Sequence, residues 1–246
     1  MKLWFSLFDE TREYRGKEAP YIEPSTQKWS RDFEINYEAI FSELKVYLEN
    51  HHLKAYFNTS MVNNDSTWKT ISLKSWGIEF NKQQKHFPCT TEIINKYPEI
   101  ISLSFNLLSP GGKILPHCGD TNAIYRSHFG LDVPDSLPNC GFSVQGEKRS
   151  WENGKWLIFM DAFQHEAWNL TEKNRIIIVM DTLRDEYKSR KNKVKSVVIT
   201  SLFLQKRVEK FKLLQKAPQW AITTIAIILR PMALMAINIV NWLRVY

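Results

Sequence analysis

Hydrophobic residues recur at three- and four-residue steps in the segment 32–50, and Glu and Lys residues occupy many of the positions between them. This spacing places the apolar side chains on one face of a helix and the charged side chains on the other. We therefore predict an amphipathic N-terminal helix whose apolar face is buried. That face consists of Phe33, Ile40, Phe41, Leu44 and Leu48.

After Trp68 the pattern changes to short apolar runs, which are typical of strands. The clearest runs are 101–108, 156–160 and 175–180. Turn residues separate the runs, and Glu152-Asn153-Gly154 contains the Asn-Gly pair that is typical of a β-hairpin. Short, closely spaced strands favour an antiparallel sandwich or jelly roll over a doubly wound α/β sheet. The other turn signals are Ser109-Pro110-Gly111-Gly112, Asp135-Ser136 and Gln145-Gly146.

Residues 184–246 combine basic and apolar segments. Lys and Arg residues flank the apolar run 197–204, which predicts one or two basic amphipathic helices. Two further apolar stretches, 220–229 and 232–240, follow, and Arg230-Pro231 lies between them. Proline interrupts helices, and neither stretch reaches the roughly 18 residues that a spanning helix needs. We therefore expect two separate apolar segments, neither of which is long enough by itself to span a membrane, and whether the tail spans a membrane stays open.

The net charge of +7 comes from this tail. Residues 184–246 contain 13 Lys or Arg and 3 Asp or Glu, a net charge of +10, whereas residues 1–183 contain 20 and 23, a net charge of −3. A nucleic-acid groove would need basic residues interleaved with aromatic residues through the folded body. The slightly acidic body therefore argues against a nucleic-acid partner. We divide the chain into a domain, 1–183, and a helical tail, 184–246.

Two interpretations of the tail stay open, contact with an anionic membrane surface and packing on the body or on another subunit. Basic residues together with Trp220, Trp242 and Tyr246 flank the apolar segments, which favours a membrane interface. The first residues lack a hydrophobic signal segment, and three cysteines are too few for a disulfide framework. We therefore expect a cytoplasmic protein that associates with the inner face of a membrane.

Two of the six histidines, His117 and His165, follow predicted strands and turns. Imidazoles from two different strands can bind one divalent metal and leave positions open for an oxygen-donor co-substrate and dioxygen. A single histidine in a sheet is more often a structural residue, so it is the pair that indicates a non-haem iron site.

Arg175 stands at the head of the apolar run 176–180. A guanidinium in such surroundings needs an anionic partner, because burying an unpaired charge is costly. A dicarboxylic co-substrate would supply that partner.

Six ordered motifs lie between about Asn36 and Thr182. They are Trp68-Lys69, Phe87-Pro88-Cys89-Thr90, the segment 108–112, Pro116 to Asn122, Arg126 to Leu131 and His165 to Asn169. In these motifs and in their order the chain resembles the aspartyl/asparaginyl β-hydroxylase-like branch of the iron(II)/2-oxoglutarate dioxygenases, and their number argues against chance agreement. The resemblance implies a double-stranded β-helix, or jelly roll, with a flanking N-terminal helix, and it does not extend to residues 184–246.

The resemblance also implies roles for particular residues. His117 and His165 are identified as ligands of iron(II). The wider superfamily has a carboxylate two residues after the first histidine, but Gly119 stands here, so water is expected on the third face of the metal. Arg175 resembles the arginine that binds the far carboxylate of 2-oxoglutarate. His128 matches a second, non-ligand histidine that hydrogen-bonds the co-substrate near the metal.

Arg126 and Asn106 are further candidates for the co-substrate site. Arg126 alternates to the same strand face as His128, which predicts a place in the pocket, on the co-substrate or on an anionic substrate group. A surface ion pair is the alternative for Arg126. Asn106 aligns with a hydroxyl residue that helps to hold 2-oxoglutarate in peptide-hydroxylating members. Asp120 lies one residue too far along the strand for a metal ligand.

The implied reaction uses 2-oxoglutarate and dioxygen to hydroxylate an unactivated C–H bond. The family includes members that act on lipid acyl groups, and the tail favours an acyl chain of a membrane lipid as the substrate. β-Hydroxylation of Asp or Asn in a peptide or protein is the alternative. An arginine two residues before Arg126 would favour an aspartyl substrate, but Ile124 stands there. A non-catalytic jelly-roll binding module is the third interpretation.

Overall fold

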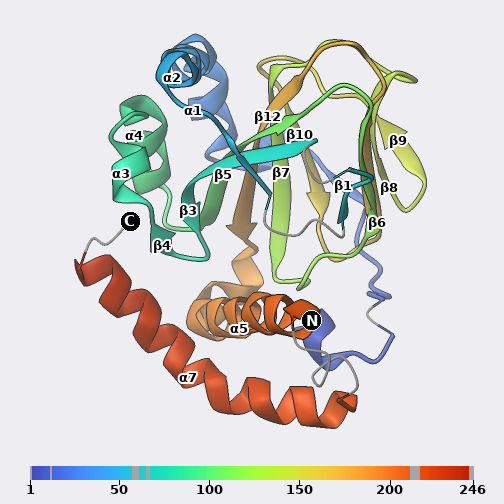
Figure 1. The fold of residues 1–246 in the computed structure, drawn as a ribbon, viewed down its shortest axis with the longest axis vertical. Helices are drawn as coiled ribbons and strands as arrows, with labels where there is room; N and C mark the ends of the chain where they lie inside the picture. The colour runs from blue at the N-terminus through green and yellow to red at the C-terminus, as the bar shows by residue number, and fades with distance from the viewer. Residues whose placement is uncertain (1, 12, 57–60, 65–66, 211–216, 244–246) are drawn as a thin grey trace.

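The computed structural model describes residues 2–11, 13–56, 61–64, 67–210 and 217–243 of the chain. Two antiparallel sheets face each other in a jelly roll, with helices on the outer face of the larger sheet and the C-terminal helices below (Figure 1). The expected mainly β fold with an N-terminal helix and a helical tail is confirmed.

The larger sheet has eight strands in the order β1-β10-β7-β12-β5-β3-β2, with β4 paired to β3, and the smaller sheet has the order β6-β11-β8-β9. The three apolar runs of the sequence correspond to β5, β10 and β12. The strands of the larger sheet are β1 (Tyr21–Ile22), β2 (Lys54–Ala55), β3 (Trp68–Ser75), β4 (Ile78–Glu79), β5 (Ile100–Leu108), β7 (Ile124–Asp132), β10 (Trp156–Met160) and β12 (Arg175–Leu183). Those of the smaller sheet are β6 (Gly112–His117), β8 (Cys140–Val144), β9 (Glu147–Arg149) and β11 (His165–Asn169).

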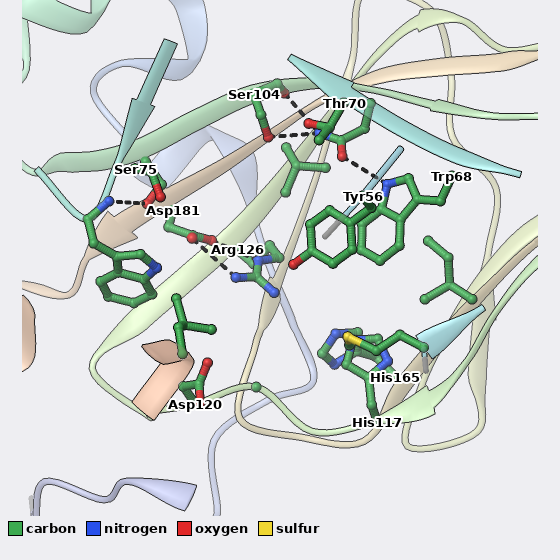
Figure 2. Close-up of a pocket in the computed structure, with 18 of the residues that line it drawn as sticks. Tyr56, Trp68, Thr70, Ser75, Ser104, His117, Asp120, Arg126, His165 and Asp181 are labelled. Carbon is green, nitrogen blue, oxygen red and sulfur yellow. Dashed lines mark hydrogen bonds and ion pairs between the residues drawn. The ribbon is translucent and has the colours of Figure 1, made fainter. Parts of the chain in front are cut away.

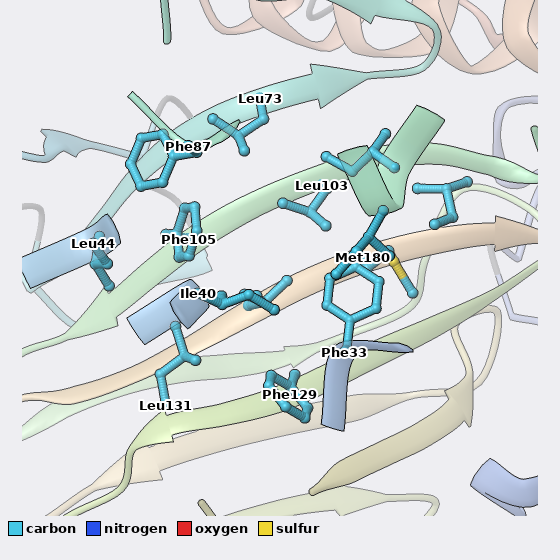
Figure 3. Packing of buried hydrophobic residues seen from close by; sticks show 14 of the residues in the cluster. Phe33, Ile40, Leu44, Leu73, Phe87, Leu103, Phe105, Phe129, Leu131 and Met180 are labelled. Atoms are coloured by element: carbon cyan, nitrogen blue, oxygen red, sulfur yellow. The ribbon is translucent and has the colours of Figure 1, made fainter. Parts of the chain in front are cut away.

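Four helices lie over the outer face of the larger sheet, and the three longest of them form the main core with it (Figure 3). The helix predicted over 32–50 is present, but Asn36 divides it, because the Asn36 side chain donates a hydrogen bond to the Asp32 carbonyl at 2.7 Å. Ile40 and Leu44 are completely buried against the sheet, as the apolar spacing predicts. The helices are α1 (Ser30–Ile35), α2 (Tyr37–Asn50), α3 (Asn81–Gln84) and α4 (Pro88–Lys96), and short 3-10 turns span Ser6–Phe8, Pro24–Thr26 and Asp185–Arg190.

Alternation along the strands of the larger sheet separates this core from the interior of the jelly roll. On β12, Ile176 and Ile178 pack under the helices, whereas Arg175 and Ile177 face the space between the sheets. Successive side chains of a strand point to opposite faces, so one strand serves both layers. The same alternation places polar residues of β3, β5 and β7 toward the smaller sheet, namely Thr70, Ser72, Ser102, Ser104, Asn106, Arg126 and His128.

The prediction of a β-hairpin at Glu152-Asn153-Gly154 is wrong. The flanking strands β9 and β10 belong to different sheets, and the turn packs on β7 instead, where Gly154 N–H donates to the Gly130 carbonyl at 2.9 Å. The hairpin of the smaller sheet joins β8 to β9 through Gln145 and Gly146, both with positive φ. Two residues with positive φ are typical of a tight hairpin turn, which Asn-Gly signals only when adjacent strands flank it.

The tail forms two helices, α5 (Lys191–Lys210) and α7 (Gln219–Leu243). The expectation of two segments separated at Arg230-Pro231 is wrong, because α7 continues through Pro231 as one helix of 25 residues. Proline lacks only one backbone N–H, and a helix can continue past it with a bend. Figure 1 shows α7 curving around the base of the molecule. By length and composition alone, α7 is long and apolar enough to cross a membrane.

The tail shares a hydrophobic cluster with the body. Val194, Val197 and Val198 of α5 are buried, and they pack with Ile101 and Ile124 of the larger sheet. Ala226 of α7 is also completely buried in this cluster. Packing on the body, one of the two interpretations of the tail, is therefore present in the structure.

Candidate active site

A cavity of about 710 Å³ lies between the two sheets (Figure 2). Its lining comes from four strands of the larger sheet, from the smaller sheet and from both tail helices. All the residues that the sequence proposes for the site reach this cavity, namely Asn106, His117, Arg126, His128, His165 and Arg175.

His117 and His165 form a direct cross-strand pair on β6 and β11. Their ring centroids lie 4.2 Å apart. His117 Nδ1 lies 2.7 Å from the Leu115 carbonyl, and His165 Nδ1 lies 2.8 Å from the Phe163 carbonyl. A carbonyl accepts from an Nδ1–H, so the neutral tautomer leaves each Nε2 lone pair available for a metal. Burial favours that neutral form, because it lowers the pKa of His117 to about 4 and lowers the pKa of His165 as well.

A carboxylate does approach this pair, but it belongs to Asp161 and was not anticipated from the sequence. Asp161 Oδ1 lies 3.8 Å from His165 Nε2. The Asp161 carboxylate also occupies the space that a Cβ at Gly119 would need. Position 119 therefore has no room for a side chain while Asp161 keeps this conformation. Burial, together with Asp181 and Asp120, raises the pKa of Asp161 to about 7 in opposition to Arg126.

Arg175 is a buried cation with unused hydrogen-bond donors. Its side chain is 1% exposed, and Nε and Nη2 have no hydrogen-bond partner among the described residues. The guanidinium carbon lies 4.6 Å from the centre of the Trp151 ring, which supplies a cation–π contact but no hydrogen bond. Burial lowers the pKa of Arg175 to about 10, so it stays protonated at neutral pH. An anion in the cavity would satisfy these donors.

His128 and Asn106 lie beside Arg175 in the lining, and each has a partner within the protein. His128 Nδ1 accepts a hydrogen bond from Trp151 Nε1 at 3.2 Å, which leaves its Nε2 for a ligand. Asn106 Oδ1 accepts from Trp68 Nε1 at 2.9 Å, and its Nδ2 donates to Ser104 Oγ at 2.8 Å. Asn106 therefore orients Trp68, and its contact with a co-substrate stays a prediction.

Arg126 faces the cavity, but two aspartates neutralise its charge. Its Nε and Nη2 donate to the two carboxylate oxygens of Asp181 at 2.7 and 3.1 Å, and Nη1 lies 2.6 Å from Asp161 Oδ1. The ion pairs are within the cavity and not on the surface. This arrangement positions Asp161 near His165 and leaves Arg126 without free charge for a co-substrate. Strand alternation predicts that Arg126 faces the pocket. It gives no information about the partners of Arg126, because Asp181 lies on another strand, β12, and Asp161 lies in the loop after β10.

The residues present fit an iron(II) and 2-oxoglutarate site. The described residues include no cluster of three or more His, Cys, Asp or Glu side chains in metal-binding geometry. The two imidazoles with available Nε2 atoms are borderline ligands that suit a divalent first-row metal. The unpartnered Arg175 donors suit the carboxylate of a dicarboxylic acid.

The fold and the cavity define a jelly-roll protein with a histidine-lined candidate active site. The chain belongs to the aspartyl/asparaginyl β-hydroxylase family, since the model of that family matches residues 34–185. The expected family is thereby confirmed, and membership in a hydroxylase family supports an enzyme.

Two relatives illustrate the range of the family. The ornithine lipid ester-linked acyl 2-hydroxylase of Rhizobium tropici is 32% identical over 170 residues, which cover 67% of this chain and 60% of the relative. The human aspartyl/asparaginyl beta-hydroxylase is 32% identical over 124 residues, which cover 48% of this chain and 16% of the relative. The match thus spans less than two thirds of either relative.

Among solved structures, a Pseudomonas putida prolyl-4-hydroxylase is similar with a TM-score of 0.40 and 13% identity. The similarity covers 60% of this chain and 86% of that structure.

Proposed function

We propose that the protein is an iron(II)/2-oxoglutarate-dependent dioxygenase that hydroxylates an unactivated C–H bond, on an acyl chain of a membrane lipid. The observation that supports the reaction class most directly is the buried Arg175, whose free donors face the cavity that contains the histidine pair. Arg175, His117 and His165 line one cavity and together offer donors for an anion and two ligands for a metal, a combination that favours a catalytic site over a metal-free binding module.

The residues of this chain have separate roles in the proposal. His117 and His165 hold the iron through Nε2, and the carbonyls on their Nδ1 atoms fix the ring orientations. Arg175 binds the far carboxylate of 2-oxoglutarate, and His128 Nε2 donates to the co-substrate. When bound, iron(II) with 2-oxoglutarate and dioxygen supplies the oxidising power for hydroxylation. Water on the third face of the metal stays a prediction.

The lipid substrate is supported by the Rhizobium relative, whose name refers to a lipid acyl group, and by the tail. α7 exposes large apolar side chains to solvent, and basic residues precede it in α5. The human relative supports the alternative, hydroxylation of Asp or Asn. Ile124 weakens that alternative, because it is completely buried against the tail cluster and outside the cavity lining, and Arg126 is already paired.

The metal ligands can be tested by anaerobic titration of the full chain with iron(II), with calorimetry as the readout. We expect one site that His117→Ala or His165→Ala abolishes. His52→Ala is the matched control, because His52 is exposed and lies far along the chain from the site. Retention of full iron affinity in both histidine variants would contradict the proposal.

The co-substrate assignment can be tested by the affinity of the iron-loaded protein for 2-oxoglutarate. Arg175→Ala removes the charge partner of a buried carboxylate, so we expect a loss of about 2–5 kcal/mol. Arg175→Lys should recover only part of the affinity, because an ammonium lacks the planar fork. Arg149→Ala removes an exposed arginine and should leave the affinity for 2-oxoglutarate unchanged.

The substrate class is tested by incubating lipid extract with the active protein and searching by mass spectrometry for products heavier by one oxygen atom.

A further inference from the structure

The cavity of the candidate active site extends from the histidine pair to the C-terminal tail. Leu202, Leu204 and Val208 of α5 line it, and so does Ile222 of α7. These residues lie outside the segment 34–185 that matches the hydroxylase family. A wall of the cavity is therefore built from a part of this chain for which the family match says nothing.

Polar contacts hold α5 against the cavity. Asp120 Oδ1 accepts hydrogen bonds from Ser201 Oγ at 3.1 Å and from Gln205 Nε2 at 3.2 Å, both on α5. Asp120 comes three residues after His117, so these bonds link the end of β6 to the tail. In the view of Figure 2, Arg126 lies above, with Asp120 at the lower left and the histidine pair at the lower right. The tail wall is thus fixed relative to the candidate metal site.

The chemical character of the lining changes along the cavity. The end with the histidine pair also contains Arg175 and the Arg126 ion pairs, and hydroxyl side chains of β3 and β5 line the larger sheet. Near the tail, Lys74 forms an ion pair with Glu79 at 3.0 Å and leaves no free charge. Asp120, Ser201 and Gln205 are polar residues at that end, and they are hydrogen-bonded to one another. The apolar side chains there are Leu7, Trp76, Phe80, Leu202, Leu204, Val208 and Ile222. A ligand that matches this lining has polar groups near the histidines and an aliphatic part against the tail.

We propose that α5 and α7 form the binding wall for the aliphatic chain of the substrate, and that Leu202 and Val208 set the chain length that the cavity accepts. This inference rests on the proposed function, since it assigns a place to the acyl chain of that substrate. The volume of about 710 Å³ exceeds what a small dicarboxylate needs, so space remains for a chain. Each methylene that becomes buried there should raise the affinity about fourfold.

Photolabelling can test where a chain binds in the metal-free full-length protein. The probe is dodecanoic acid with a diazirine at its terminal carbon, and peptide mass spectrometry locates the label. We expect label on α5 between Leu202 and Val208 or on Trp76. Unlabelled dodecanoic acid in excess should remove it. Label confined to the exposed face of α7, or to the outer face of the smaller sheet, would overturn the proposal.

Chain-length dependence provides a second test with purified variants. Calorimetry with straight-chain fatty acids from octanoic to stearic acid measures the preferred length. Leu202→Trp and Val208→Trp place larger side chains in the cavity. We therefore expect these variants to bind the longest chain that the wild type accepts about tenfold more weakly. Leu202→Ala enlarges the cavity and should shift the preference to longer chains. Phe203→Trp is the matched control, because Phe203 is 47% exposed on the same helix and does not line the cavity.

These outcomes separate the inference from the proposed function. Chain binding at α5 without any iron or 2-oxoglutarate binding would support the tail wall and contradict the dioxygenase. Iron and 2-oxoglutarate binding with an unchanged length preference in all three wall variants would overturn the tail wall and leave the dioxygenase in place. Because Leu202→Trp and Leu202→Ala act in opposite directions, a general loss of folding cannot imitate the expected pair of results.

Discussion

At the residue scale, the Asp161 carboxylate occupies the space beside His165 that a side chain at position 119 would need. The backbone N–H of Gly119 donates to the Asp161 carbonyl at 2.8 Å, and the Asp161 carboxylate fills the space beside the Gly119 Cα. Arg126 holds that carboxylate from the other side. The absence of a side chain at position 119 and the presence of Asp161 are therefore two parts of one arrangement.

A double-mutant cycle tests this coupling. We expect Gly119→Ala to lower the free energy of unfolding by about 1–3 kcal/mol, because the new methyl group overlaps the Asp161 carboxylate. In an Asp161→Ala background the same substitution should cost less, since only the backbone carbonyl of residue 161 still crowds position 119. Urea unfolding of the four proteins measures the coupling. Equal costs in both backgrounds would contradict the shared position.

At the scale of elements, α7 is attached to the body near both of its ends. Gln219 Nε2 donates to the Leu7 carbonyl at 2.7 Å. Near the other end, Asn241 Nδ2 donates to the Gly77 carbonyl at 2.7 Å, and Asn241 Oδ1 accepts from the Glu79 backbone at 3.0 Å. A helix whose two ends contact the same domain lies along that domain. We therefore favour a helix that lies on a membrane surface over one that crosses the membrane.

Asn241→Ala tests the attachment of the C-terminal end of α7. Loss of two hydrogen bonds should weaken local stability by about 1–2 kcal/mol, so amide hydrogen exchange should accelerate in 232–243 and not in 219–226. Asn238→Ala is the matched control, because Asn238 is exposed on the same helix. Uniform acceleration along the whole helix would indicate that Asn241 supports α7 in general and does not act as a local attachment.

At the scale of the whole molecule, one stripe of α7 offers an apolar surface for a membrane. Ile228, Met232, Met235 and Ile239 follow helical spacing, and each is at least 50% exposed. Trp220 and Trp242 near the ends of the helix are 71% and 81% exposed. The opposite face of α7 packs on the body and contributes to the cavity through Ile222. One helix thus places the proposed membrane contact next to the proposed chain-binding wall.

Vesicle binding of the full-length protein tests this surface. We expect co-sedimentation with phosphatidylglycerol vesicles, and the double variant Ile228→Ser with Met235→Ser should weaken it about tenfold or more because less apolar surface is buried. Salt should weaken binding only in part, since the apolar contribution is not screened. Ile35→Ser is the matched control, because Ile35 is 70% exposed on α1. Failure of the wild type to bind such vesicles would contradict the membrane proposal.

The sequence alone was sufficient for features that depend on local pattern. Apolar spacing predicted the helical segment 32–50, and apolar runs between turn residues predicted β5, β10 and β12. Alternation along β7 placed Arg126 and His128 in one cavity, because the strand period does not depend on the neighbouring strand. The ordered motifs identified the family and, with it, the pair His117 and His165.

The tertiary structure alone decided which distant residues meet. Asp161 takes the place beside Gly119, and Arg126 is neutralised by Asp161 and Asp181, because these contacts depend on the register of strands and on loops between them. The tail forms a wall of the cavity because α5 buries its apolar face against the body, a contact that spacing within residues 184–246 cannot reveal. Local periodicity determines which face of an element is apolar, and only packing determines what that face touches.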